Sequence, residues 1–128
     1  MGLLLQRNPT FTWPISYRER TDGGRYRQHN FTAVFKRLPQ SELEEIQLEY
    51  QRLKVAVTRD VPVDSIPTRE ICNRIWVGWS DIFEEDGTTQ VPFSEELKSE
   101  LVQREGLADA IVETYIESAA QAKAKAKN

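Results

Sequence analysis

An alternation of apolar and polar residues near the N-terminus constrains the fold of this 128-residue chain more than any other feature. Aromatic or aliphatic residues occupy every second position from Phe11 to Tyr17, a period of two that is typical of a β-strand with one buried face. Pro14 has no amide hydrogen to donate, so this strand is expected at a sheet edge or at a bulge. The turn signal Thr21–Gly24 and a second alternating segment, Phe31–Phe35, follow. Together they predict an antiparallel hairpin over roughly residues 10–37.

Helical signals follow the hairpin. Ser41 and Glu44 have the spacing of a capping box at a helix start. Apolar residues recur from Thr68 to Phe83 and predict a second helix with a wide apolar face, ended by the turn Glu85–Gly87. The first helix carries a narrower stripe, made of Leu43, Ile46, Tyr50, Leu53 and Val57. That stripe either completes the core or forms a seam for self-association.

Two more helices are expected in the C-terminal third. Pro92–Ser94 is a helix start in which Ser94 accepts a hydrogen bond from a free amide, and two glutamates follow at the positive end of the helix. Gly106 interrupts the pattern, and the apolar stripe from Leu107 to Ile116 predicts a last helix. Residues 119–128 offer no apolar face and are expected to fray.

These signals predict an α+β fold, with an N-terminal antiparallel β-hairpin packed on a bundle of three or four α-helices. The length fits one domain, residues 1–128, with a basic hairpin segment (1–39), a helical body (40–118) and a frayed basic tail (119–128). The sign of the net charge changes between the hairpin segment and the helical body. Residues 1–39 hold seven Lys or Arg and two Asp or Glu, whereas the remaining residues hold ten and eighteen. The chain is therefore basic at one end and acidic elsewhere.

The residue types that support catalysis are sparse. The one histidine, His29, is interpreted as a solvent-facing strand residue, and the one cysteine, Cys72, as a small buried hydrophobe in a reducing compartment. The acidic run Asp81–Asp86 does not continue as a calcium-binding loop, because the twelfth position is Pro92. No glycine-rich phosphate loop is found, and the apolar run at the N-terminus is too short to cross a membrane. We expect no enzyme activity, no cofactor, no metal and no membrane association.

The basic hairpin leaves a nucleic-acid-binding regulator as an alternative. Basic and aromatic residues alternate there, a composition that binds single-stranded nucleic acid by charge and stacking. They are Arg18, Arg20, Arg25, Arg27, Lys36 and Arg37, with Tyr17, Tyr26 and Phe31. The aromatic side chains are also needed to cover the helices, and the rest of the chain is acidic, so nucleic acid is the less favoured partner.

Several short motifs follow one another in order over roughly residues 70–128. They are Gly78-Trp79, Glu85-Asp86-Gly87, Pro92-Phe93-Ser94-Glu95-Glu96-Leu97, Leu101, Gly106-Leu107-Ala108, Ala110-Ile111-Val112 to Tyr115, and the final Lys127-Asn128. In this order they resemble the tail assembly chaperones of long-tailed bacteriophages. The hairpin is not part of the resemblance, and its role there stays open.

The resemblance implies a non-enzymatic protein of the host cell cytoplasm that is absent from the mature virion. Such chaperones cover the long, helical tape measure protein until subunits of the tail tube protein polymerise around it. Tape measure helices expose apolar stripes, which a second apolar surface can cover by helix-in-groove packing. We therefore expect the tape measure protein and the tail tube protein as partners. We also expect a homo-oligomer whose many copies give avidity. Whether a frameshifted longer product exists is left open.

The predicted partner-binding face combines aromatic and aliphatic residues of the matched region. It consists of Trp76, Trp79, Phe83, Phe93, Leu97, Leu101, Ile111 and Tyr115. Trp76 and Trp79 are three residues apart and would share one face of a helix, either partly exposed or filling the core. A virion structural part, such as a tail terminator or neck protein that uses the hairpin as an assembly strand, is a further alternative.

Overall fold

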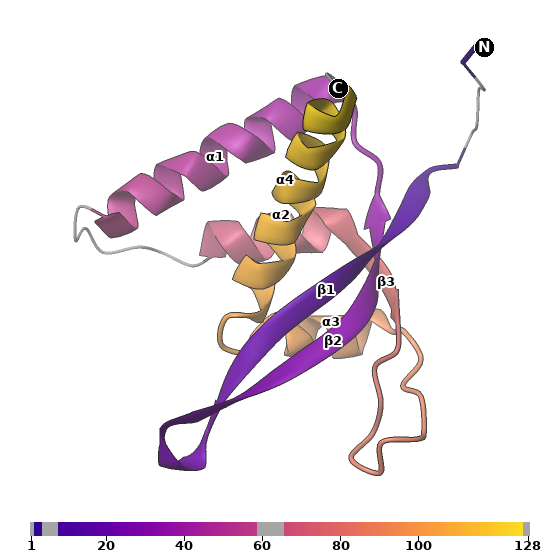
Figure 1. The fold of residues 1–128 in the computed structure, drawn as a ribbon, viewed down its shortest axis with the longest axis vertical. Coiled ribbons are helices and arrows are strands. Elements are labelled where there is room, and N and C mark those ends of the chain that lie inside the picture. Colours follow the sequence, from indigo (N-terminus) through magenta and orange to yellow (C-terminus); the bar gives the residue numbers. More distant parts are fainter. Residues whose placement is uncertain (1, 4–7, 59–65, 127–128) are drawn as a thin grey trace.

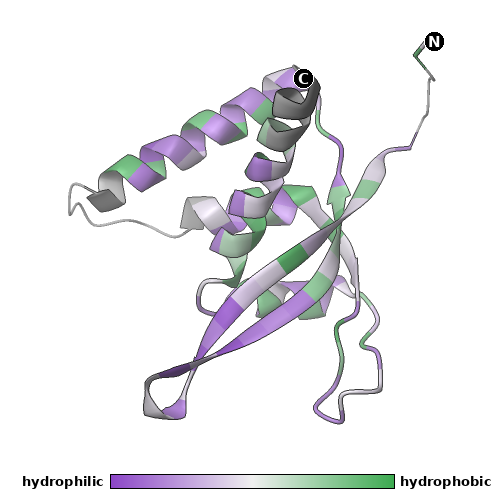
Figure 2. Ribbon diagram, in the orientation of Figure 1, coloured by the Kyte–Doolittle hydropathy of each residue, from purple (hydrophilic) through white to green (hydrophobic). Residues whose placement is uncertain are grey.

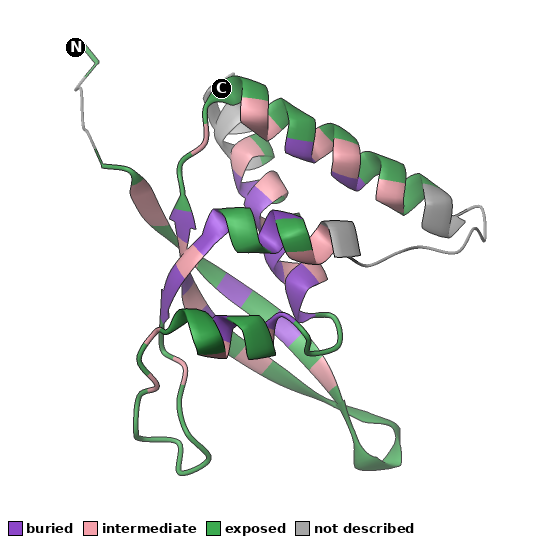
Figure 3. Ribbon diagram, turned by 180° about the vertical axis from the view of Figure 1, so that it is seen from behind, coloured by how far each residue is buried: buried purple, intermediate pink, exposed green. Residues whose placement is uncertain are grey.

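The structure is a computed structural model that describes residues 2–3, 8–58 and 66–126. Over these residues the chain has the predicted α+β fold, with a hairpin, a third strand and helices packed against the sheet. The elements are β1 (Thr10–Thr21), the short 3-10 turn η1 (Asp22–Gly24), β2 (Arg25–Lys36), α1 (Gln40–Thr58), α2 (Ile66–Ile75), β3 (Trp76–Ser80), α3 (Glu95–Leu101) and α4 (Leu107–Ala126). Figure 1 and the opposite view in Figure 3 place these helices on one side of the sheet, with the far end of the hairpin extending beyond them.

The predicted hairpin is confirmed. β1 and β2 pair in antiparallel register from Thr10 opposite Lys36 to Thr21 opposite Arg25. The turn between them uses positive φ angles at both glycines, 76° at Gly23 and 73° at Gly24. The strand order among the described residues is β1-β2-β3, so β1 lies at an edge, as its proline predicts.

The predicted helix over Thr68–Phe83 is wrong in its second half. α2 ends at Ile75, and Trp76 begins β3, which pairs antiparallel with β2. The two tryptophans therefore lie on a strand and not on one face of a helix. The run from Trp76 to Trp79 is too short and too uniformly apolar to reveal its period, and pairing with β2 decides its conformation.

A bulge in β3 turns both tryptophans toward the core. Phe35 lies opposite Trp76, whereas Val34 lies opposite Gly78, so Val77 is an extra residue between the two pairs. Side chains in a regular strand alternate between faces, and residues three apart would point in opposite directions. The extra residue compensates for this difference, so both indole rings face the helices.

The N-terminus of α1 differs from its prediction, whereas that of α3 agrees with it. α1 begins at Gln40, and the amide of Leu43 already donates to the carbonyl of Pro39 at 3.0 Å. Ser41 is therefore inside the first turn, and the capping-box prediction is wrong in register. The predicted cap of α3 is confirmed, because the hydroxyl of Ser94 accepts a hydrogen bond from the amide of Leu97 at 3.1 Å.

The last helix is longer than expected. Gly106 has a φ of 79° and separates α3 from α4, which confirms the predicted break. α4 then continues to Ala126, beyond the predicted apolar stripe, and the expected fraying of residues 119–128 stays a prediction. Alanine and lysine favour a helix intrinsically, and the apolar stripe that precedes them provides a folded first half on which the helix extends.

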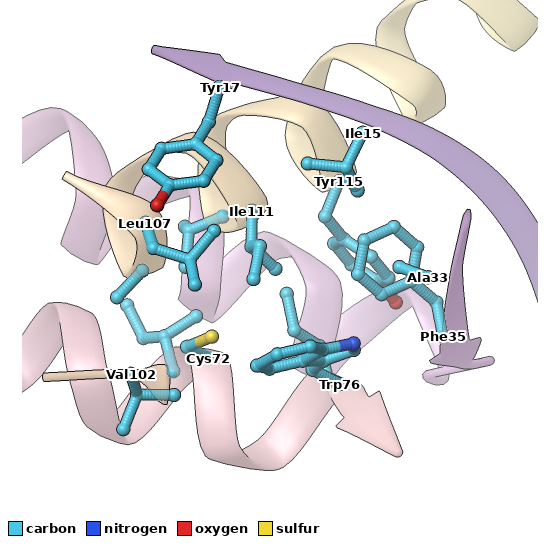
Figure 4. Close-up of a cluster of buried hydrophobic side chains, with 14 of the residues drawn as sticks. Ile15, Tyr17, Ala33, Phe35, Cys72, Trp76, Val102, Leu107, Ile111 and Tyr115 are labelled. Atoms are coloured by element: carbon cyan, nitrogen blue, oxygen red, sulfur yellow. The ribbon is translucent and has the colours of Figure 1, made fainter. Parts of the chain in front are cut away.

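The core fills the space between the inner face of the sheet and the helices α2 and α4, as Figure 4 shows. Apolar residues gather on these inward faces in Figure 2, and the exposed end of the hairpin is polar. Cys72 is fully buried, which confirms its predicted role as a small hydrophobe, and burial raises the pKa of its thiol to about 12. The largest fully buried side chains are Trp76, Phe35, Ile15, Ile46, Ile75, Ile111 and Val112.

Candidate functional site

The eight residues predicted for partner binding do not form one exposed face. Four lie in the core, namely Trp76, Trp79, Ile111 and Tyr115. Three are partly buried against it, namely Phe93, Leu97 and Leu101. Only one of the eight, Phe83, is exposed, with 44% of its surface accessible. The four core residues cannot contact a partner in this conformation, because they are buried between the sheet and the helices.

The two tryptophans organise the core differently. Their ring centroids lie 5.3 Å apart, and Trp79 also meets the ring of Phe93 edge-on at 4.8 Å. Trp79 Nε1 donates to the carbonyl of Val91 at 2.8 Å. Trp76 Nε1, by contrast, has no hydrogen-bond partner among the described residues. Trp79 therefore joins the core to the segment that carries Phe83.

Phe83 lies in residues 81–91, a short segment after β3 that folds back on itself and is called the ribbon below. It pairs with Gln90 as an isolated β-bridge, and the amide of Val91 donates to the carbonyl of Ile82 at 2.7 Å. The predicted role of Glu85–Gly87 as a helix end is therefore wrong, because these residues lie in the turn of the ribbon. The backbone bonds hold Phe83 in a fixed position, although its side chain faces solvent.

The turn of the ribbon is itself ordered by Asp86. Its carboxylate accepts hydrogen bonds from the amides of Thr88 and Thr89, both at 2.8 Å, and from the hydroxyl of Thr89 at 2.6 Å. These bonds, above all those from Thr89, lower the pKa of Asp86 to about 2. Gly87 supplies the positive φ of 75° that closes the turn.

A groove of about 600 Å³ lies between the hairpin, the ribbon and the connection from α3 to α4. This size is typical of ligand-binding clefts in proteins, about 300–1,000 Å³. Its lining residues are Tyr17, Glu19, Arg27, His29, Asn30, Phe31, Asp81, Ile82, Phe83, Glu84, Glu85, Leu101, Arg104 and Leu107. Two residues of the predicted face, Phe83 and Leu101, are therefore brought together here with groups that were not predicted.

Charged groups connect the hairpin to the α3–α4 connection across one side of the groove. Glu19 lies 3.0 Å from His29 and 3.2 Å from Arg104, measured between the nearest nitrogen and oxygen atoms. The hydrogen bond with His29 is the main reason that the pKa of Glu19 lies below its ordinary value. His29 also stacks on Tyr17, with ring centroids 5.2 Å apart. It is half-buried rather than facing solvent, and it lies between Glu19 and Tyr17.

The basic hairpin offers less aromatic surface than its composition indicates. Tyr17 and Phe31 are buried, and Tyr26 is 59% exposed. The guanidinium of Arg18 lies over the ring of Tyr26, 4.6 Å from its centroid, and Arg20 forms an ion pair with Glu105 at 2.8 Å. One of the three rings that could stack on a base is therefore exposed.

The described part of the chain shows neither a metal-binding cluster nor a membrane-spanning helix. Within residues 2–3, 8–58 and 66–126, no group of three or more His, Cys, Asp or Glu side chains is arranged to hold a metal ion. No helix in the same ranges is both long and apolar enough to span a membrane. Comparisons with known protein families, curated proteins and solved structures found no significant match to this chain.

Sequence reasoning missed the groove because its walls come from distant segments. Glu19 and Arg104 are 85 positions apart, and their contact depends on the length of the hairpin. A local signal for the ribbon was present, since Asp86-Gly87 between apolar residues is typical of a hairpin turn. The predicted helix over Thr68–Phe83 extended into this region, so the turn was interpreted as the end of that helix.

Proposed function

We propose that this protein is a tail assembly chaperone that binds and shields an apolar helical stripe of the tape measure protein. The main supporting observation is Phe83, an exposed aromatic side chain fixed at the rim of a groove that is lined by both apolar and charged residues. Exposed aromatic residues on rigid elements are frequent energetic centres of protein interfaces, because little conformational freedom is lost on binding. The ordered motifs over residues 70–128 support the same proposal.

The shielding mechanism needs no reaction. A client helix that places apolar side chains against Phe83, Ile82 and Leu101 removes them from water and from contact with other client copies. Each single contact is small, so several chaperone copies along one long client would act together. Such weak contacts release the client when subunits of the tail tube protein cover it more extensively.

We favour a protein partner over nucleic acid because the hairpin presents one exposed ring, Tyr26, and because Arg20 and Arg104 already pair with glutamates. Steep salt dependence of binding to single-stranded DNA or RNA would favour the alternative. Its loss on replacing both Arg25 and Arg27 by alanine would identify the hairpin as the nucleic-acid site.

Co-expression with the tape measure protein tests the proposal. Phe83→Ser should lower the affinity for the client about ten-fold or more, since an exposed aromatic anchor is lost, and should reduce the client's soluble fraction. Leu48→Ser is the matched control, because Leu48 is an exposed apolar residue (65%) on α1 and does not line the groove. Unchanged capture by Phe83→Ser, or failure of the wild-type protein to keep the client soluble, would contradict the proposal.

A further inference from the structure

We infer that the groove selects an amphipathic helix by its flanking charge, taking one whose apolar stripe is bordered by lysine or arginine on the ribbon side. This inference rests on the proposed function, and it specifies the chemistry of the client segment. It follows from the separation of apolar, acidic and basic groups around the groove.

The apolar part of the groove is continuous with the core. Tyr17, Phe31 and Leu107 line the groove and are buried. Ile82 and Leu101 are partly exposed, and Phe83 is the most exposed apolar residue of the lining. An apolar stripe on a client can therefore contact a surface that leads from the exposed ring toward the interior.

Negative charge is concentrated on the ribbon wall. Asp81, Glu84 and Glu85 are exposed and follow one another closely in the chain. Asp81 accepts a hydrogen bond from the hydroxyl of Thr32 at 3.2 Å, which fixes its carboxylate. Among the described residues, no ion pair neutralises Glu84 or Glu85.

The opposite side of the groove carries the positive charge. Arg27 projects from the hairpin, and Arg104 comes from the α3–α4 connection. Glu19, the acidic residue on this side, forms an ion pair with Arg104, so Arg27 carries the net positive charge of this side. The two walls therefore differ in sign, with one net positive charge on the hairpin side and three carboxylates on the ribbon.

A client helix with basic residues along one border of its stripe matches this arrangement. Its apolar side chains contact Phe83, Ile82 and Leu101, while its lysines lie opposite Glu84 and Glu85, which are exposed to solvent. Exposed ion pairs contribute little affinity each, so the apolar contacts hold the helix and the charges select it. Selection by charge also accelerates association and rejects helices with an acidic border.

Two synthetic peptides of about 18 residues, five helical turns, test the inference. Both carry the same leucine stripe, bordered by lysines in one peptide and by glutamates in the other. Fluorescence anisotropy measures their affinities for the full-length protein at low and high salt. We expect the lysine peptide to bind about ten-fold more tightly at low salt, and the difference to shrink at high salt.

Charge reversal of the ribbon provides the decisive variant. The double substitution Glu84→Lys and Glu85→Lys should invert the preference, so that the glutamate peptide binds more tightly. Glu45→Lys with Glu70→Lys is the matched control. It changes the net charge by the same amount at two residues that line the space between α1 and α2, and it should keep the wild-type preference. Circular dichroism and thermal melts confirm that each variant is folded.

The outcomes separate the two proposals. If Phe83→Ser weakens capture of the tape measure protein as expected but the ribbon variant keeps the lysine preference, the charge inference is wrong and the proposed function stands. Equal affinity for both peptides, or no binding of either, also overturns the inference. A dimer in sedimentation velocity that Phe83→Ser dissociates would show a second copy in the groove, and would overturn it as well.

Discussion

At the scale of single residues, the two tryptophans illustrate how similar side chains acquire different roles. Both are buried in the core, with 0% of Trp76 and 8% of Trp79 exposed. The indole N–H of Trp79 is satisfied by the carbonyl of Val91, whereas that of Trp76 is unpaired among the described residues. An unpaired buried donor lowers stability, and a paired one contributes modestly to it.

This difference predicts an asymmetry between two conservative substitutions. Trp76→Phe and Trp79→Phe each remove part of a buried ring and leave a cavity. Trp79→Phe also leaves the carbonyl of Val91 without its donor, so it should cost about 1 kcal/mol more in the free energy of unfolding. Urea denaturation of both variants measures the difference. A larger loss for Trp76→Phe would mean that the unpaired N–H carries little penalty.

At the scale of elements, the short helix α3 is held from both ends. Ser94 caps its N-terminus through the amide of Leu97. Lys98 is buried, and its ammonium donates to the carbonyl of Asn73 in the last turn of α2 at 3.0 Å. A cation at the C-terminus of a helix satisfies a free carbonyl and interacts favourably with the helix dipole. α3 therefore links α2 to the connection that forms one side of the groove.

The serines of this segment give a matched pair of variants. Ser94→Ala should lower the free energy of unfolding by about 1 kcal/mol, because it removes the N-cap. Ser99→Ala should change it by less than about 0.5 kcal/mol, since the hydroxyl of Ser99 only donates back to the carbonyl of Glu95 within the helix. Thermal or chemical unfolding measures both. Equal effects would show that capping does not stabilise α3.

At the scale of the whole molecule, α1 is attached less extensively than the other long helix. Of its side chains at positions 40–55, Ile46 and Tyr50 are buried. The hydroxyl of Tyr50 donates to Asp109 of α4 at 3.1 Å, and burial together with nearby carboxylates raises its pKa above the ordinary value. α4, in contrast, buries residues along three turns, from Leu107 to Ser118. Figure 3 shows this contrast in the burial colours of the two helices.

Native-state hydrogen exchange should reflect this difference. We expect the amides of α1 to exchange about ten-fold or more faster than those in the buried part of α4, because few apolar contacts hold α1 in place. Ile46→Ala should accelerate exchange in α1 further and leave β1 and β2 nearly unchanged. Uniform protection of both helices would indicate that they unfold as one unit.

The proposed chaperone role also belongs to this scale, because the groove exists only when the hairpin, the ribbon and the α3–α4 connection are assembled. The selectivity that we propose depends on opposite charges on separate elements. In this proposal, the exposed ring of Phe83 and the acidic residues beside it act only together with the opposing wall.

Local patterns in the sequence were sufficient for elements whose signals lie within a few residues. The alternation from Phe11 to Tyr17, the glycine turn after it, the Ser94 cap and the break at Gly106 act through nearest neighbours in the chain, so their predictions are confirmed. α4 runs past the apolar stripe to Ala126, because a helix propagates from a folded start even where no apolar face continues.

Tertiary structure decided the conformation of Trp76–Ser80 and the identity of the exposed residues. This segment has apolar residues that suit a buried helix or a buried strand equally, and only pairing with β2, more than forty positions earlier, selects the strand. That choice buries both tryptophans and leaves Phe83 at the surface. The sequence thus determined which residues are apolar enough to bind a partner. The folded chain decided which of them the core uses, because burial depends on contacts between distant segments.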